Sequence, residues 1–331
     1  PVSSAFWHTG LWQSWSPDCR YLYYQSGTGE KPSVTRRELA TGRERTIADA
    51  DLEGAPTGWA LPVSGMLGML YAAGYADGHY RPEQSPIPFD ERDSHGLFEY
   101  DFDTGEKRLA LSVQQVLDAS PDERLAQWDG EQRQRTGNGL TLMLYCLRWS
   151  PDGKRMLFHF GNHCVDKRRG EPRILKIFTA NADRTNIRLA LDLCEKPGVH
   201  WSWQPDNARL VGYGPVPRTP KGLALCAVDA DGGNFHKIAG HNSGGHPSVH
   251  PTLPHLALTD TGSQPGKIEL IDLRTDETVW SLAQDREWGP QTPGRNPNRV
   301  CHHPVFSRDG RSVWLNRMQG RYAQVVRVEL P

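Results

Sequence analysis

The sequence of 331 residues contains no apolar run of 18 residues, so no transmembrane helix is expected. It also lacks an excess of charge of either sign. Its 38 Lys and Arg residues against 39 Asp and Glu residues give a net charge of −1, which argues against a general electrostatic attraction to nucleic acid. None of the six cysteines has CxxC spacing, so we expect free, buried thiols for most of them rather than disulfides.

The sequence also lacks a signal peptide, since it begins at Pro1 without Met. We expect a secreted or periplasmic protein whose export signal lies outside this sequence.

Turn-forming residues are abundant, with 33 Gly and 25 Pro, and they recur in a fixed context. In residues 149–158 a Pro-Asp-Gly turn separates two short apolar runs. Pro presets φ at the first turn position, and Asp and Gly suit a tight return, so the stretch predicts a β-hairpin. Related stretches start at Trp15, Trp203, Val249 and Phe306, and a weaker copy spans 59–71.

A second pattern, a strand followed by Asp and a short polar turn, occurs at 98–105, 177–183, 227–233 and 270–276. Units of roughly 45–57 residues with about four strands each are typical of a β-propeller. We therefore predict an all-β fold in which residues 1–331 form a single β-propeller domain. Six units can be counted, at 12–50, 59–112, 148–191, 200–238, 246–282 and 303–330, and residues 113–140 or the termini are the candidates for a seventh.

Histidine recurs just before the predicted inner strands, at His8, His200, His246, His302 and His303. The inner strand of each blade lines the central channel, so residues just before it lie at the channel mouth. For any one of these histidines a hydrogen-bonded turn residue is an equally good interpretation. For the set, a functional channel mouth is the better hypothesis.

His-Pro precedes the inner strand in two adjacent units, at 246–247 and 303–304. His246, Cys301 and His303 (or His302) would bring nitrogen and sulfur ligands together, which suits zinc. The alternative is a set of strand-edge hydrogen bonds.

A long insertion, residues 74–94, interrupts the second unit and brings His79, Arg81 and the following His95 above the channel. Such a group can neutralise a carboxylate and transfer a proton near neutral pH, although a solvated loop is the alternative. Tyr145 precedes the inner strand of the third unit and should face the same mouth. Further candidates to bind an acidic sugar there are Arg148, His159, His163, His200 and Trp201.

Five stretches, taken together, resemble the propeller polysaccharide lyases: 79–82, 93–101, 144–153, 245–248 and 301–310. The resemblance is to the ulvan lyases and the rhamnose–glucuronate lyases, and more distantly to oligogalacturonate lyase. It covers nearly the whole chain, although each motif is short. Members of that group have seven blades, so the resemblance favours seven.

The resemblance implies β-elimination at a uronic acid. Its implied substrates are glucuronate-containing glycans, whose cleavage yields a 4,5-unsaturated uronate. His79 and His95 match the family's paired histidines, and Tyr145 lies near its tyrosine. His246, Cys301 and His303 match its structural-metal region, which implies a divalent ion, zinc or calcium, and no organic cofactor.

Two departures from the family pattern bear on activity. Tyr145-Cys146 stands where Asn-His is usual, and Phe160-Gly161 stands where His-Arg is usual. Either Lys167, Arg168 or Arg169 neutralises the carboxylate instead, or the substrate specificity has changed, or the activity has been lost. We predict a monomeric lyase whose partner is an acidic oligo- or polysaccharide. The alternatives are a TolB-like propeller that binds a carbohydrate or a protein without catalysis, and an oligogalacturonate-lyase-like enzyme whose metal contacts the substrate.

Overall fold

The structure is a computed structural model, and it describes residues 16, 18–26, 33–47, 59–60, 66–70, 75–76, 79–80, 91–162, 170–216, 222–240, 245–260, 267–283, 302–319 and 322–331. Neither helix in this part of the chain is long and apolar enough to cross a membrane.

Antiparallel sheets with consecutive strand order account for most of the described residues. Four of them have four strands and two have three, and a separate hairpin is formed by β6 (Tyr75–Ala76) and β7 (His79–Tyr80). The first two sheets are β1 (Tyr21–Ser26), β2 (Ser33–Glu38), β3 (Glu44–Ile47) and β4 (Trp59–Ala60), β5 (Met66–Leu70), β8 (Gly96–Asp101), β9 (Lys107–Ser112).

The next two sheets are β10 (Met143–Trp149), β11 (Arg155–Gly161), β12 (Leu175–Asn181), β13 (Arg188–Asp192) and β14 (Val199–Trp203), β15 (Arg209–Pro215), β16 (Leu223–Asp229), β17 (His236–Ala239). The last two are β18 (Ser248–Val249), β19 (Leu256–Asp260), β20 (Lys267–Asp272), β21 (Glu277–Ala283) and β22 (Val305–Phe306), β23 (Ser312–Gln319), β24 (Tyr322–Glu329).

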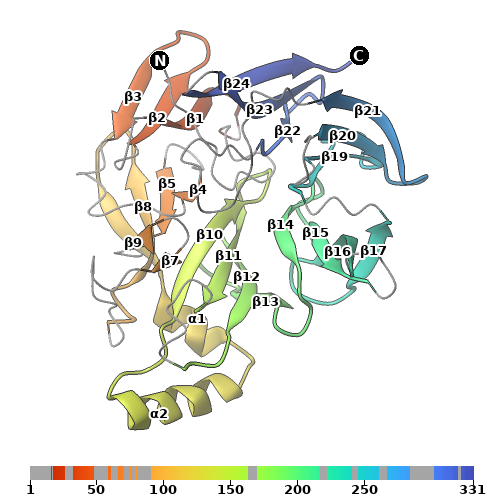
Figure 1. Cartoon of the computed structure of the whole chain (residues 1–331). Coiled ribbons are helices and arrows are strands. Elements are labelled where there is room, and N and C mark those ends of the chain that lie inside the picture. The colour runs from red at the N-terminus through yellow and green to blue at the C-terminus, as the bar shows by residue number, and fades with distance from the viewer. Residues whose placement is uncertain are drawn as a thin grey trace.

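These sheets follow one another around a centre, with the first strand of each sheet innermost (Figure 1). The predicted class, an all-β propeller, is therefore confirmed. The preference for seven blades is wrong, because the described residues form fewer than seven such sheets.

The region offered as a seventh blade is helical where it is described. It forms α1 (Val113–Ala119) and α2 (Arg124–Thr136). Ser112 and Gln115 form a capping box at the start of α1: the Gln115 amide donates to Ser112 Oγ at 3.1 Å, and the Ser112 amide donates to Gln115 Oε1 at 2.8 Å. This local bonding fixes a helix start directly after a strand, so the segment cannot continue as a further sheet.

The core lies between the sheets, because the middle strands bury both faces. Six of the seven residues of β12 are buried, and only Asn181 at its end is partly exposed. Phe178 of β12 stacks on Phe158 at 6.2 Å and meets the edge of Phe160 at 5.6 Å. Near-continuous apolar strands are expected where a sheet is covered on both sides by its neighbours.

The turns that begin at Ser16, Ser150 and Ser307, each with Asp two residues later, are held together by the same pair of side-chain bonds. Ser150 Oγ donates to Asp152 Oδ1 at 2.7 Å and accepts the Arg155 amide at 2.9 Å. Ser307 makes the matching bonds to Asp309 and Ser312. Gly153 has φ of 71°, a left-handed conformation that glycine adopts without strain. The bonds that stabilise the hairpin lie within the motif itself. The hairpin could therefore be predicted from the sequence.

Two faces of the ring follow from the antiparallel order. We call the face with these turns the turn face, and the face where β10, β14, β18 and β22 begin the mouth face. On the turn face, Arg308 Nη1 donates to the carbonyl of Pro151 at 3.4 Å, so the turn before β23 contacts the turn before β11 across the ring.

Three cysteines have described side chains, and all three are free thiols. Cys226 is buried as predicted, whereas Cys19 and Cys194 are exposed.

Candidate functional site at the mouth face

Three histidines from three consecutive sheets occupy the same position in the repeat. His200, His246 and His303 each lie three residues before the last residue of their inner strands, which are β14, β18 and β22. Because inner strands of neighbouring sheets start side by side, the three imidazoles gather at the mouth of the ring. In β10 the same position is held by Cys146.

A local irregularity of the strand directs two of these side chains. The pairing of β14 with β15 shifts register between Val199 and Ser202, and His200 within this bulge has φ of 59°. His303 has φ of 43°. Positive φ is uncommon for residues other than glycine and costs about 1–3 kcal/mol at a site of this kind. Bulges next to functional sites turn a side chain away from its regular direction.

The three rings contact one another. His246 Nε2 and His303 Nε2 are 2.9 Å apart, and their rings meet edge to face with centroids 3.9 Å apart. The ring of His200 lies 4.0 Å from that of His246, centroid to centroid. The described contacts therefore unite His200, His246 and His303 into one group, which we call the histidine cluster.

Asp260, the last residue of β19, orients the cluster. Its carboxylate accepts the His246 amide at 2.7 Å and His246 Nδ1–H at 2.9 Å, and it accepts the His303 amide at 3.3 Å. Burial alone would raise the pKa of Asp260, but His246, His303 and these hydrogen bonds hold it well below its usual range. Asp260 is therefore an ionised carboxylate in a buried position, stabilised by two neighbouring sheets.

The hydrogen bonds fix the tautomers of two rings. His246 Nδ1–H donates to Asp260, and His200 Nδ1–H donates to the carbonyl of Gly245 at 2.6 Å. In the neutral form of either ring, Nε2 then carries the lone pair. Burial, with a contribution from His246, lowers the pKa of His200 to about 3, so this imidazole is neutral at physiological pH.

The side-chain types of the histidine cluster are ones that can bind a metal ion. Within the described ranges no group of three or more His, Cys, Asp and Glu side chains has the full geometry of a metal site. Two imidazole nitrogens that bind one tetrahedral ion at about 2.0–2.1 Å lie about 3.3–3.4 Å apart, so the 2.9 Å between the Nε2 atoms of His246 and His303 would have to widen. The Asp260–His246 bond is the carboxylate support that metal-binding histidines usually have.

The other predicted residues divide between the mouth face and the sheet boundaries. His95 is buried just before β8, and its carbonyl accepts the Val113 amide at 2.8 Å. Burial lowers the pKa of His95 to about 4. His159 of β11 pairs in register with Tyr145 of β10 near the start of the inner strand, and β7, which contains His79, pairs with β6 between β5 and β8 of the chain.

Arg148 and Trp201 are buried where two sheets meet. Arg148 Nη1 donates to the carbonyl of Trp201, and Trp203 Nε1 donates to the carbonyl of Arg148 at 3.1 Å. Both residues thus contribute to the boundary between β10 and β14. Arg81, His163 and Cys301 lie outside the described residues, as do the side chains of His79 and Tyr145.

Sequence reasoning did not single out Asp260, and it proposed His200 as a substrate-binding residue, whereas the structure places the His200 ring beside that of His246. An Asp at the end of a short strand is common in loops and gives no signal by itself. The signal for His200 was available, because it occupies the same repeat position as His246 and His303.

The sequence matches no protein-family profile and no curated protein. Its fold is similar to that of solved propellers. One is an oligogalacturonate lyase in complex with manganese, with a TM-score of 0.52, 16% identity, and coverage of 96% of this chain and 76% of that chain. Another is the oligogalacturonate lyase from Vibrio parahaemolyticus, with a TM-score of 0.51, 11% identity, and coverage of 100% and 91%.

TolB from Acinetobacter baumannii is a further neighbour, with a TM-score of 0.45, 15% identity, and coverage of 82% of this chain and 52% of that chain. This chain thus spans about half the length of that protein. At these identities the likeness shows the fold alone. The predicted likeness to oligogalacturonate lyase holds at that level, and a likeness to ulvan or rhamnose–glucuronate lyases is not shown.

Proposed function

We propose that the chain is a polysaccharide lyase that cleaves a uronic-acid-containing glycan, with glucuronate as the preferred uronate. The observation that carries the proposal is the histidine cluster at the mouth face, in which Asp260 orients the His246 ring and the Gly245 carbonyl orients the His200 ring. His95, whose imidazole is also neutral, immediately precedes β8. The solved lyases with a similar fold are consistent with the proposal but do not establish it.

The reaction requires three groups. A base takes the C5 proton of the uronate, the C4–O4 bond breaks as the C4=C5 double bond forms, and an acid protonates the departing O4. His95 fits the base, because burial keeps its imidazole unprotonated at neutral pH. His79 and Tyr145 are proposed as its catalytic partners, with Arg81, His159 and His163 binding the substrate. Developing charge on the carboxylate must be balanced by fixed positive groups or dipoles.

His246 and His303, with His200 beside them, would hold a divalent metal. Imidazole ligands favour zinc or a similar transition metal over calcium, which prefers oxygen ligands. When bound, the ion would neutralise negative charge at the mouth and join neighbouring sheets. We propose that the main role of the ion is structural, the joining of neighbouring sheets, because the candidate ligands come from adjacent sheets.

The proposed setting follows from the substrate class. An acidic polysaccharide is an extracellular polymer in most settings, so a secreted or periplasmic location is proposed, with the chain acting as a monomer. No organic cofactor is required by the elimination.

The first prediction concerns product formation. Incubation with glucuronate-containing glycans should raise the ultraviolet absorbance of unsaturated uronates, and His95→Gln should lower the initial rate at least about 100-fold, the usual contribution of a general base. His255→Ala, a histidine on the turn face, is the matched control and should retain the rate. Absence of the absorbance change across a broad panel of uronate glycans would refute the lyase.

The second prediction concerns the metal. Zinc added to metal-free protein should raise the melting temperature, because a ligand that binds only the folded state stabilises it, by about 2.7 kcal/mol at 100 times its Kd. His246→Ala should abolish the shift. If chelation abolished turnover and left the melting temperature unchanged, the metal would instead act on the substrate, as in the oligogalacturonate-lyase-like alternative.

Glycan binding without product, unchanged in His79→Ala, would point to the non-catalytic binding propeller in place of the lyase.

A further inference from the structure

Ion pairs close the boundaries between consecutive sheets on the turn-face side. Each joins a middle strand of one sheet to the outer turn of the next sheet, and the pairs are Arg36–Asp103, Glu99–Arg184 and Arg155–Asp231. In the last of these, Arg155 also donates to Thr179 Oγ1 at 3.1 Å and lies over the ring of Trp203, 5.4 Å from its centroid. Charge and an aromatic ring therefore fill that boundary.

The next boundary, between β15 and β20, lacks the acid. Arg209 begins β15 as Arg155 begins β11, and the strand registers make Arg274 the counterpart of Asp231. Arg274 bends back to its own sheet, where its Nε donates to Asp272 Oδ1 at 2.9 Å. Among the described residues this boundary therefore has an arginine at the position of Arg155 and no carboxylate facing it from the neighbouring sheet.

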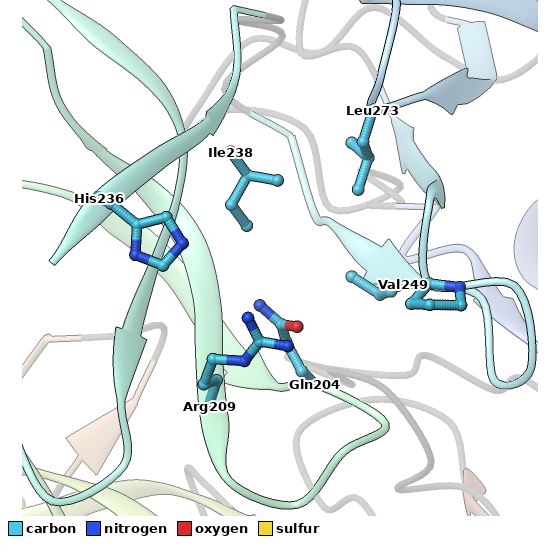
Figure 2. A pocket seen from close by; sticks show the side chains of 7 residues that line it. Gln204, Arg209, His236, Ile238, Val249 and Leu273 are labelled. Carbon is cyan, nitrogen blue, oxygen red and sulfur yellow. The ribbon is translucent and has the colours of Figure 1, made fainter. Parts of the chain in front are cut away.

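The side chains at this boundary are also smaller than those at the preceding one. By register, Val249 replaces Trp203 at the end of the inner strand, and Ala227 replaces Thr179 in the third strand. The result is a cavity of about 120 Å³ (Figure 2). This open cleft is smaller than the closed cavity of about 150 Å³ that holds benzene, so a ring-sized group would be enclosed only in part.

The cavity has one polar and one apolar wall. The side chains of Gln204 and Arg209 point into it together (Figure 2). Gln204 is 7% exposed and lines the cavity beside Arg209. Arg209 Nε donates to Asp206 at 2.6 Å, which leaves its two terminal nitrogens without a partner in the described part of the chain. The opposite wall is formed by Ile238, Val249 and Leu273.

The guanidinium of Arg209 is partly exposed and pairs with Asp206 of its own sheet, so within the described residues its terminal nitrogens can still donate to a bound acceptor, as Arg155 donates to Asp231. We propose that this cleft binds a small monocarboxylate with a ring-sized apolar body. The carboxylate takes the place that Asp231 occupies at the preceding boundary and accepts from Arg209 and Gln204. The apolar body packs on Ile238, Val249 and Leu273. The site is on the turn face, so it stands independently of the proposed lyase.

Benzoate is a suitable probe, titrated into the full chain and followed by ligand-observed NMR or calorimetry, with benzamide as the neutral match. Benzoate should bind saturably with a Kd at least about tenfold below that of benzamide, because hydrogen bonds to a charged group contribute about 1.5–3 kcal/mol. Arg209→Met should weaken benzoate binding about 10- to 100-fold. Arg188→Met, an exposed arginine of β13, is the control and should leave it unchanged.

A second variant tests the comparison between boundaries. Arg274→Asp places an acid opposite Arg209, as Asp231 lies opposite Arg155 at the preceding boundary. The variant should abolish benzoate binding, and its circular dichroism spectrum should match that of the wild type. Val249→Leu, which narrows the cavity with little change of shape, should weaken binding as well. Equal binding of benzoate and benzamide, no saturation at tens of millimolar benzoate, or unchanged binding in Arg274→Asp would each overturn the proposal.

Discussion

Asp260→Ala is expected to lower the free energy of unfolding by about 3–5 kcal/mol, which is the usual cost of breaking a buried charged group away from its partners. The carboxylate is 5% exposed and accepts hydrogen bonds from His246 and His303, which belong to different sheets. Its removal leaves two buried N–H groups of His246 without an acceptor and frees the imidazole to rotate.

The measurement is denaturant unfolding of the wild type and the variant, each with and without zinc. Asp183→Ala is the control, because Asp183 is exposed and also accepts a backbone amide, that of Thr185 at 3.0 Å. It should cost no more than about 1 kcal/mol. In Asp260→Ala the affinity for zinc should also fall about 10- to 100-fold, because a carboxylate that is hydrogen-bonded to a metal-binding imidazole holds that ring in its orientation. Equal losses in the two variants would show that Asp260 has no special role.

Acidification should destabilise the protein well before most of its carboxylates are protonated. Burial lowers the pKa of His95 from 6.5 to about 4, so the unfolded chain binds a proton at this residue between these values while the folded chain does not. Stability from His95 is therefore fully present above pH 6.5 and is lost as the pH falls to about 4. The loss amounts to about 3 kcal/mol, at 1.36 kcal/mol for each pKa unit.

His250 contributes in the same direction. Burial lowers its pKa, and its Nδ1 accepts the amides of Thr252 at 3.2 Å and Leu253 at 3.0 Å, which protonation would prevent. Unfolding midpoints measured from pH 7.5 to 4 should fall steeply in the wild type and less steeply in His95→Gln, by about 3 kcal/mol over the range. The exposed His236→Gln should follow the wild type. A wild-type profile that is flat between pH 6.5 and 4.5 would contradict the prediction.

The parts of the fold that could be predicted are those encoded locally. The turns with Ser and, two residues later, Asp make their bonds within six residues, as Ser150, Asp152 and Arg155 do, so these hairpins could be located from the sequence. The number of blades could not be obtained in this way. It was taken from a resemblance, and the capping box of Ser112 and Gln115 placed a helix in the region where a further sheet was considered.

The candidate site was predictable only in part, for a geometric reason. His246 and His303 could be placed near each other because their units are adjacent and each histidine precedes the inner strand; the structure puts their Nε2 atoms 2.9 Å apart. Asp260 comes from the far end of the next strand, and its relation to His303, 43 residues away, depends on packing between sheets. The roles of these residues in binding a metal stay a prediction, as do those of His79 and Tyr145.

The contact between Arg308 and the Pro151 carbonyl has a consequence for how a polymer could be handled. The contact joins the turns that follow β22 and β10 on the turn face. If the chain is the proposed lyase and this contact narrows the axis of the ring, a glycan bound at the mouth face would leave on the side from which it arrived. Substrate and cleaved fragments would share one route, and crowding of that route by long chains would slow turnover through product release rather than through bond breaking.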